Sequence, residues 1–330
     1  MSSPIETVVD SRLRRQLVVA LGAAASLGLR QAHAQPAWPT RPVTVIVPFA
    51  PGGAGNGSVR ILAEVIGPQL GQPLIVENRP GAGGITGTQA VAQSADDHLL
   101  LMGSTTMTIL PALRGDLPYD AARDLQPVGM ISSQPQVVAV AANSPLRTLD
   151  DLVAKGKAQG LTAGNAGVGT LSHLSTELLN RKFGLQIMPV PYRGDALLIP
   201  DVASGNISLG VLNLPVALPL IQAGRLRALA VTSAQPVAGL PGVPLLRVLG
   251  DEFVITGWAA MLAAKNVPSA GIERFGTLLR AALADAGVRE KFAAFGVTPE
   301  PATPAQLREF LRAETARWSD VVRSRGIKLE

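Results

Sequence analysis

The sequence predicts an α/β fold of two lobes, the first of them built on a parallel sheet that helices cover on both faces. Short apolar runs alternate with amphipathic segments along most of the 330-residue chain, and this alternation occurs in two separate series. The 34 Gly and 26 Pro are spread between the apolar runs without forming repeats, a distribution typical of tight strand-to-helix junctions. With 47% apolar residues, the chain can fill two cores.

The first 34 residues have the order of a secretory signal. Arg12, Arg14 and Arg15 precede an uncharged stretch of 14 residues, and Ala32-His33-Ala34 supplies a small-x-small cleavage site. A membrane-spanning helix needs about 20 apolar residues, which disfavours an uncleaved anchor. We therefore expect residues 1–34 to be cleaved and the mature chain to be exported, by the general route or, given the adjacent arginines, by the twin-arginine route.

Composition excludes several classes of protein. The chain has no cysteine, which rules out a lipid-anchoring cysteine, disulfides and thiolate metal sites. Without residues 1–34 it has 25 basic and 22 acidic residues, no block of Lys or Arg, and 4% aromatic residues overall. These values argue against a nucleic-acid surface, where clustered cations neutralise phosphates, and they suit a small anionic ligand.

The first series of elements has the order strand, helix, strand, helix, strand. The predicted strands are 43–49, 74–76 and 99–102, with helices over 59–70 and 86–93. In the first helix Val59, Leu62, Ala63, Ile66 and Leu70 lie on one face. This βαβαβ order predicts the parallel sheet of the first lobe.

The second series begins after 143–145, where Thr148 and Asp151 form a variant of the capping box. We expect strands at 161–163, 187–190, 207–212 and 226–232, and a helix that carries Leu171, Leu174 and Leu178. From Pro268 onward the pattern is mostly helical. It ends in a long amphipathic helix whose apolar face predicts docking on a sheet, with a return to the first lobe. That face carries Leu307, Phe310, Leu311, Trp318, Val321 and Val322.

Two Gly-rich loops, 48–58 and 164–170, each lie between the end of a strand and the start of a helix. Glycines let the backbone approach a ligand closely, and the free N–H groups at a helix start favour an anion. A single loop of this kind is equally compatible with a plain turn, and neither loop has the spacing of a Walker or dinucleotide motif. Two such loops, one per lobe, predict a cleft that holds a carboxylate from both sides.

Other polar groups could also contribute to the same cleft. The hydroxyls of 104–106 follow a strand at the correct end of the sheet. We interpret His98 as structural, and His173 as either a packing residue or a donor at the rim of the cleft. The sequence has no Gly-x-Ser-x-Gly elbow and no His, Cys and carboxylate cluster at metal spacing, so we expect no catalytic residue, no metal and no cofactor.

Several motifs in order resemble the Bug receptors, the extracytoplasmic solute-binding subunits of tripartite tricarboxylate transporters. The resemblance runs from Trp38 to Glu330. Its carriers are the stretches 38–42, 47–53, 76–84, 101–103, 117–120, 190–194 and 224–232.

This resemblance implies a type II periplasmic binding protein of the Venus-flytrap form, in which the chain crosses the hinge twice. We place the first lobe at 35–142 plus 257–330 and the second at 143–256. It also implies a periplasmic monomer that takes a small organic carboxylate to integral membrane transporter subunits. The residues expected to bind the ligand are Phe49, Ala50, Pro51, Gly52, Gly53, Asn56, Ser104, Thr105, Thr106, Gly164, Asn165, Ala166, Gly167, Gly169, Thr170, His173, Tyr192, Arg193, Gly194 and Asn213.

Two departures from the family pattern bear on the ligand. Many members carry an acid where this chain has Asn56, and many have an Asp at the position of Leu212. Loss of negative charge at the cleft favours a plain mono- or dicarboxylate over a ligand with an amino group. Two alternatives use the same cleft: a sensor that presents its ligand to a membrane signalling partner, and a secreted enzyme.

Overall fold

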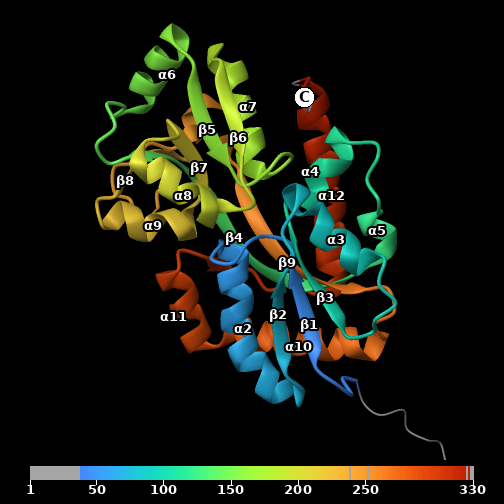
Figure 1. Ribbon diagram of the computed structural model, residues 1–330. Coiled ribbons are helices and arrows are strands. Elements are labelled where there is room, and N and C mark those ends of the chain that lie inside the picture. The colour runs from blue at the N-terminus through green and yellow to red at the C-terminus, as the bar shows by residue number, and fades with distance from the viewer. Residues whose placement is uncertain (1–37, 238, 251–252, 325, 328–330) are drawn as a thin grey trace, which may run out of the picture. The chain divides into compact units, whose positions relative to one another are not determined.

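The apolar runs pair into two sheets that share one long strand, β4 (Leu125–Ala141) (Figure 1). The computed structural model describes residues 38–330 apart from 238, 251–252, 325 and 328–330, so the expected signal at 1–34 lies outside the described residues. Residues Trp38–Glu330 form one compact unit. Among the described residues, no helix has both the length and the apolar character that a membrane crossing requires.

The first sheet has the strand order β2-β1-β3-β9-β4, with the short β10 paired to β4. Its three βαβ strands are parallel, as predicted, and β9 and β4 are antiparallel to their neighbours. The strands are β1 (Val43–Val47), β2 (Leu74–Asn78), β3 (Leu99–Ser104), β9 (Thr256–Ala264) and β10 (Thr298–Pro299). The helices that follow or cover them are α2 (Ala54–Leu70), α3 (Ile85–Ala92), α4 (Thr106–Leu113), α5 (Ala121–Asp124), α10 (Ser269–Ala284) and α11 (Ala286–Ala294).

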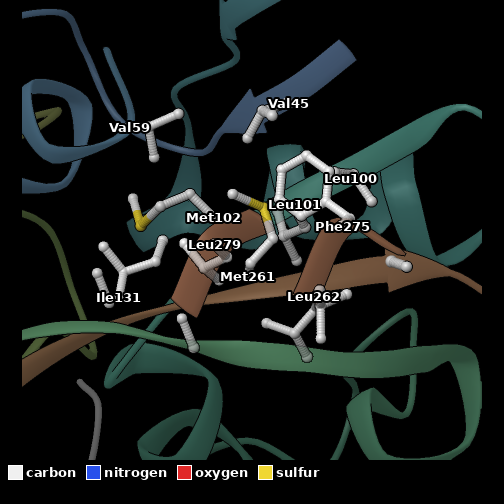
Figure 2. Close-up of a cluster of buried hydrophobic side chains, with 14 of the residues drawn as sticks. Val45, Val59, Leu100, Leu101, Met102, Ile131, Met261, Leu262, Phe275 and Leu279 are labelled. Atoms are coloured by element: carbon white, nitrogen blue, oxygen red, sulfur yellow. The ribbon is translucent and has the colours of Figure 1, made fainter. Parts of the chain in front are cut away.

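The core of the first lobe lies between this sheet and the helices α2 and α10. Figure 2 shows Val45 of β1, Leu101 of β3 and Met261 of β9 packed with Phe275 and Leu279 of α10, all of them buried. Burying each such side chain contributes about 1.5–3 kcal/mol. This packing fixes the ends of β1 and β3, from which the loops of the site begin.

The second sheet consists of the end of β4 with β7, β5 and β6 on one side and β8 on the other. Its strands are β5 (Leu161–Asn165), β6 (Ile187–Pro191), β7 (Leu209–Asn213) and β8 (Leu226–Val231). Its helices are α6 (Leu149–Ala158), α7 (Leu171–Phe183), α8 (Asp195–Ser204) and α9 (Leu214–Gln222). Along β4, Val137 and Ala139 face one core while Val138 and Val140 face the other, the period of two that a sheet covered on both faces requires.

Strands β4 and β9 connect the lobes, and neither was among the strands predicted from the sequence. β4 pairs with β9 as far as Pro135 and with the second sheet from Gln136 onward, and β9 begins at Thr256. Two prolines, Pro127 and Pro135, and the polar run 132–134 obscure the strand pattern of β4. The lobe bounds given above, at 142/143 and 256/257, stay a prediction.

The long C-terminal helix α12 (Pro304–Ser324) has the predicted apolar face but contacts more than the first lobe. Leu307 lies in the core of the first lobe. Trp318 and Val322 lie in a core of the second lobe, in the same hydrophobic cluster as the buried leucines of α7. A helix of 21 residues is about 30 Å long, which is enough to reach both cores.

Candidate functional site

A cavity of about 80 Å³ lies where the carboxyl ends of the parallel strands of both lobes meet. We call it the interlobe cavity. At roughly 10–15 Å³ for each water-sized molecule, it has room for a small organic acid. Its lining residues are Phe49, Ala50, Gly53, Ala54, Gly55, Asn56, Met102, Ser104, Thr105, Thr106, Gln134, Gln136, Ala166, Thr170, Leu171, Ser172, Gly194, Asp195, Asn213, Gly257, Trp258 and Ala259.

Five helices begin at this cavity. The helices α2, α4, α7 and α8 each start at a lining residue, and the residue before α9, Asn213, also lines the cavity. None of the five has a side chain that caps its N-terminus, whereas α5, α6 and α11 are capped by Asp120, Thr148 and Asp285. The first-turn N–H groups and the helix dipoles therefore give the cavity a positive potential that favours an anion.

Asparagine side chains hold the first Gly-rich loop in place. The Asn78 amide donates to the Phe49 carbonyl oxygen at 2.8 Å, and Asn56 Nδ2 donates to Asn78 Oδ1 at 3.0 Å. Asn56 Oδ1 accepts from Arg60 Nε at 3.1 Å. These contacts keep the loop rigid as it enters α2, and they occupy most of the hydrogen-bonding capacity of Asn56.

The second Gly-rich loop is fixed by its own hydroxyls. Thr170 Oγ1 donates to the Gly167 carbonyl oxygen at 2.6 Å, and Ser172 Oγ accepts from the Ala166 N–H at 3.0 Å. The Gly167 N–H donates to Asn165 Oδ1 at 3.0 Å. Because these side chains bond the loop itself, the start of α7 stays open toward the cavity.

Three residues that line the cavity each have a buried polar atom without a hydrogen-bond partner in the part of the chain that the structure describes. These atoms are Trp258 Nε1, Gln134 Oε1 and Asp195 Oδ1. Trp258 and Gln134 come from β9 and β4 at the hinge and are 3% and 6% exposed. Since unpaired buried polar groups are costly, these three atoms are candidate hydrogen-bond partners for a ligand.

Asp195 is the only residue with a charged side chain among those that line the interlobe cavity. Burial raises its carboxyl pKa to about 6 from the usual 3.8, and the two hydrogen bonds from Asn213 act in the opposite direction. Sequence analysis missed this residue. The cavity therefore has an acid despite the departures at Asn56 and Leu212, and the buried Leu212 side chain belongs to a core of the second lobe.

The two lobes touch across the cavity. The Ala50 N–H of the first lobe donates to the Arg193 carbonyl oxygen of the second at 3.1 Å. The backbones of Gly83 and Gly167 are so close that a Cβ atom on Gly167 would lie 3.1 Å from Gly83 Cα. The structure is therefore the closed form of the two lobes.

Residues 58–327 match the model of the tripartite tricarboxylate transporter family receptor. The chain belongs to this family. It is 37% identical to the protein BugT of Bordetella pertussis over 312 residues, which cover 93% of this chain and 96% of BugT. The resemblance predicted from the sequence is thus confirmed.

Solved structures of similar receptors confirm the predicted periplasmic-binding-protein fold. The periplasmic binding protein BugD superposes with a TM-score of 0.84 at 28% identity, covering 89% of this chain and 100% of BugD. An adipate-bound protein of R. palustris gives 0.83 at 31% identity, covering 88% and 99%. Malate-bound MatC from Rhodopseudomonas palustris gives 0.81 at 27% identity, covering 86% and 100%.

The cavity brings together slightly more than half of the residues predicted to bind ligand in this receptor. Those that line it are Phe49, Ala50, Gly53, Asn56, Ser104, Thr105, Thr106, Ala166, Thr170, Gly194 and Asn213. Those outside its lining are Pro51, Gly52, Gly164, Asn165, Gly167, Gly169, His173, Tyr192 and Arg193. The role of both groups in ligand binding stays a prediction.

Two of the residues outside the lining have clear contacts elsewhere. Tyr192 directs its hydroxyl to Asp201 Oδ2 at 2.6 Å, and desolvation, followed by the Asp201 carboxylate, raises the tyrosine pKa to about 12. His173 Nδ1 accepts from the Gly169 N–H at 3.3 Å, and burial lowers its pKa. Both side chains brace the loops of the second lobe.

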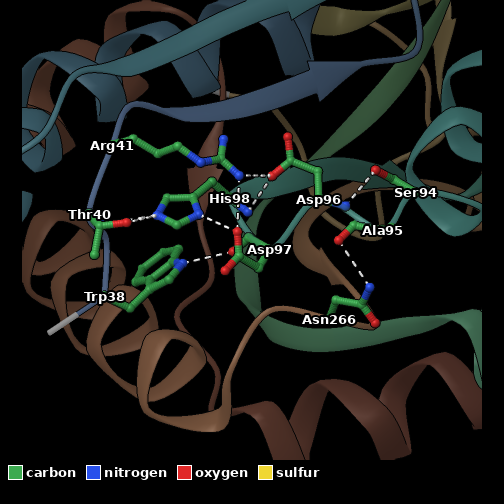
Figure 3. A network of polar contacts seen from close by, with 9 residues as sticks. All are labelled: Trp38, Thr40, Arg41, Ser94, Ala95, Asp96, Asp97, His98 and Asn266. Atoms are coloured by element: carbon green, nitrogen blue, oxygen red, sulfur yellow. Dashed lines mark hydrogen bonds and ion pairs between the residues drawn. The ribbon is translucent and has the colours of Figure 1, made fainter. Parts of the chain in front are cut away.

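The structure contains a cluster of two acids and a histidine with ligand atoms close together, contrary to the prediction that no such cluster exists. Ligand atoms of Asp96, Asp97 and His98 lie within 4.8 Å of one another (Figure 3). The Arg41 guanidinium bonds both carboxylates, at 2.6 and 3.0 Å. His98 Nε2 accepts from the Thr40 N–H at 3.0 Å while Nδ1 contacts Asp97 at 2.6 Å. These groups already have partners, and they tether the segment before β1 to the start of β3.

Proposed function

We propose that this receptor captures a small organic carboxylate in the interlobe cavity and presents it, in the periplasm, to integral membrane transporter subunits. One observation carries the proposal: five helix N-termini without side-chain caps converge on a small cavity between the lobes. Of the similar receptors, one was solved with adipate and MatC with malate, both of them dicarboxylates.

The carboxylate is held without a cationic side chain, since none is among the residues that line the cavity. The first-turn N–H groups at Ala54 and Gly55 and the Trp258 Nε1–H donate from the first lobe. From the second lobe, the donors are the N–H groups at the N-terminus of α7 and the hydroxyl groups beside it. Such preorganised neutral donors stabilise an anion that buried lysine or arginine would otherwise have to neutralise.

Ligand contacts with both lobes favour the closed form. The lobes open about the hinge made by β4 and β9 to admit the ligand. When they close over it, the hydrogen bond between Ala50 and Arg193 forms. Transporter subunits then distinguish the closed from the open form. We propose binding without turnover, after export with cleavage at Ala34.

Thermal unfolding tests this proposal. The purified protein is unfolded, freed of bound small molecules and refolded, and its melting is measured with a panel of mono- and dicarboxylates and with the matching amides. A carboxylate at a hundred times its Kd stabilises the native state by about 2.7 kcal/mol. Stabilisation by a carboxylate and not by its amide is the expected result. Equal stabilisation by acid and amide, or none across the panel, would contradict the proposal.

A further inference from the structure

Asp195 is held in one orientation at the start of α8. It is 3% exposed. Its Oδ2 accepts from Asn213 Nδ2 at 2.6 Å and from the Asn213 N–H at 3.2 Å. Asp195 is one of the residues that line the interlobe cavity, and its Oδ1 is buried without a hydrogen-bond partner in the described chain. Burial raises the pKa of this carboxyl to about 6 against the two donors of Asn213, so at neutral pH the group is ionised and Oδ1 is an acceptor.

A second unpartnered acceptor belongs to another residue that lines the cavity. Gln134 Oε1, from the hinge strand β4, is buried and has no hydrogen bond from the described residues. A ligand that carries only carboxylate oxygens offers no donor to either acceptor.

Resting on the proposed function, we infer that the ligand carries a hydrogen-bond donor, a hydroxyl or an ammonium group, beside its carboxylate, and that Asp195 is the specificity-determining residue that accepts it. The ligand carboxylate then bonds the start of α2 and Trp258, while its donor bonds Asp195 in the second lobe. Each end of the ligand contacts a different lobe, which is what closure requires.

Asp195→Asn provides a test with a distinctive outcome. The two Asn213 donors hold the amide oxygen of the new side chain, so its NH₂ group takes the place of Oδ1 and faces the cavity. The substitution thereby replaces an acceptor with a donor at nearly constant size. The preferred ligand changes from one that donates at this point to one that only accepts.

The experiment measures Kd by calorimetry for succinate, malate and aspartate, which carry hydrogen, hydroxyl or ammonium at the same carbon. The same three substituents are compared on glutarate and on propionate. In each series that binds, the wild type is expected to favour a donor-bearing acid over its parent by tenfold or more. Asp195→Asn is expected to remove or reverse that ratio. The control Asp150→Asn, on the exposed first turn of α6, leaves the ratio unchanged.

Two results would overturn the inference. If the parent acid binds the wild type as tightly as its hydroxy and amino analogues, Asp195 does not select a donor, although carboxylate capture still stands. The same holds if Asp195→Asn or a second variant, Asp195→Ser, folds and keeps the wild-type ratio. If no acid of any series binds the wild type, the proposed function fails and the inference fails with it.

Discussion

Gly83→Ala tests whether closure of the lobes, and not folding alone, determines ligand affinity. Gly83 has φ 65°, a conformation that costs an alanine roughly 1 kcal/mol in any folded form of the protein. A Cβ atom there would also lie closer than 3.0 Å to the Val168 carbonyl oxygen of the second lobe. This overlap exists only when the lobes are closed. Overpacking of this kind costs about 1–3 kcal/mol.

The expected result is a Kd weakened by roughly 5- to 150-fold, the equivalent of that cost, together with a small loss of stability without ligand. Gly71→Ala is the matched control, since Gly71 has φ 79° and no atom within 4 Å of an added Cβ. It should lose similar stability and keep the wild-type Kd. Calorimetric titration gives the affinities and urea unfolding gives the stabilities. Wild-type affinity in Gly83→Ala, or equal losses of affinity in both variants, would refute the reasoning.

Three further predictions concern single side chains. Trp258→Phe removes an unpartnered indole N–H and should weaken carboxylate binding about tenfold or more. Trp38→Phe is the control and should leave Kd unchanged, because the Trp38 N–H bonds the Asp97 carbonyl oxygen outside the cavity. Equal Kd values for the two variants would contradict this prediction. Because the folded-state pKa of Asp195, about 6, lies above 3.8, its burial destabilises the fold increasingly as pH rises through that interval. Without ligand, the unfolding free energy of the wild type relative to Asp195→Asn should therefore fall by about 3 kcal/mol between pH 3.5 and pH 7, and a difference independent of pH would contradict the assignment. Thr148→Ala should cost about 1 kcal/mol of unfolding free energy in urea by removing the cap of α6, with Kd unchanged; no loss of stability would show that the cap is not formed in solution.

The features predicted from the sequence are those with a local signature. The loops 48–58 and 164–170 join apolar strands to amphipathic helices, so their glycines and the following helix starts are visible in consecutive residues. The capping box of Thr148 and Asp151 is local in the same way, and the structure confirms both of its hydrogen bonds. Local patterns of this kind sufficed to predict the parallel strands of both lobes and two of the uncapped helices at the cavity, α2 and α7, whereas α4, α8 and α9 were not predicted.

The features that were missed depend on residues far apart in the sequence. Gln134 and Trp258 reach the cavity because β4 pairs with β9, more than a hundred residues later, and no periodicity in either segment reveals that pairing. Asp195 follows a glycine in an ordinary turn, and only its burial beside Asn213 distinguishes it from a solvated acid. Tertiary pairing therefore supplies the hinge side of the site, whereas local sequence supplies its loops.

The most direct test of the central claim is a crystal structure of the protein with the carboxylate that stabilises it most. The account predicts the ligand in the interlobe cavity of a closed form, with a carboxylate oxygen within hydrogen-bonding distance of the N–H groups at the start of α2 or of Trp258 Nε1. A ligand bound elsewhere, or one whose carboxylate faces away from all five helix N-termini, would contradict it.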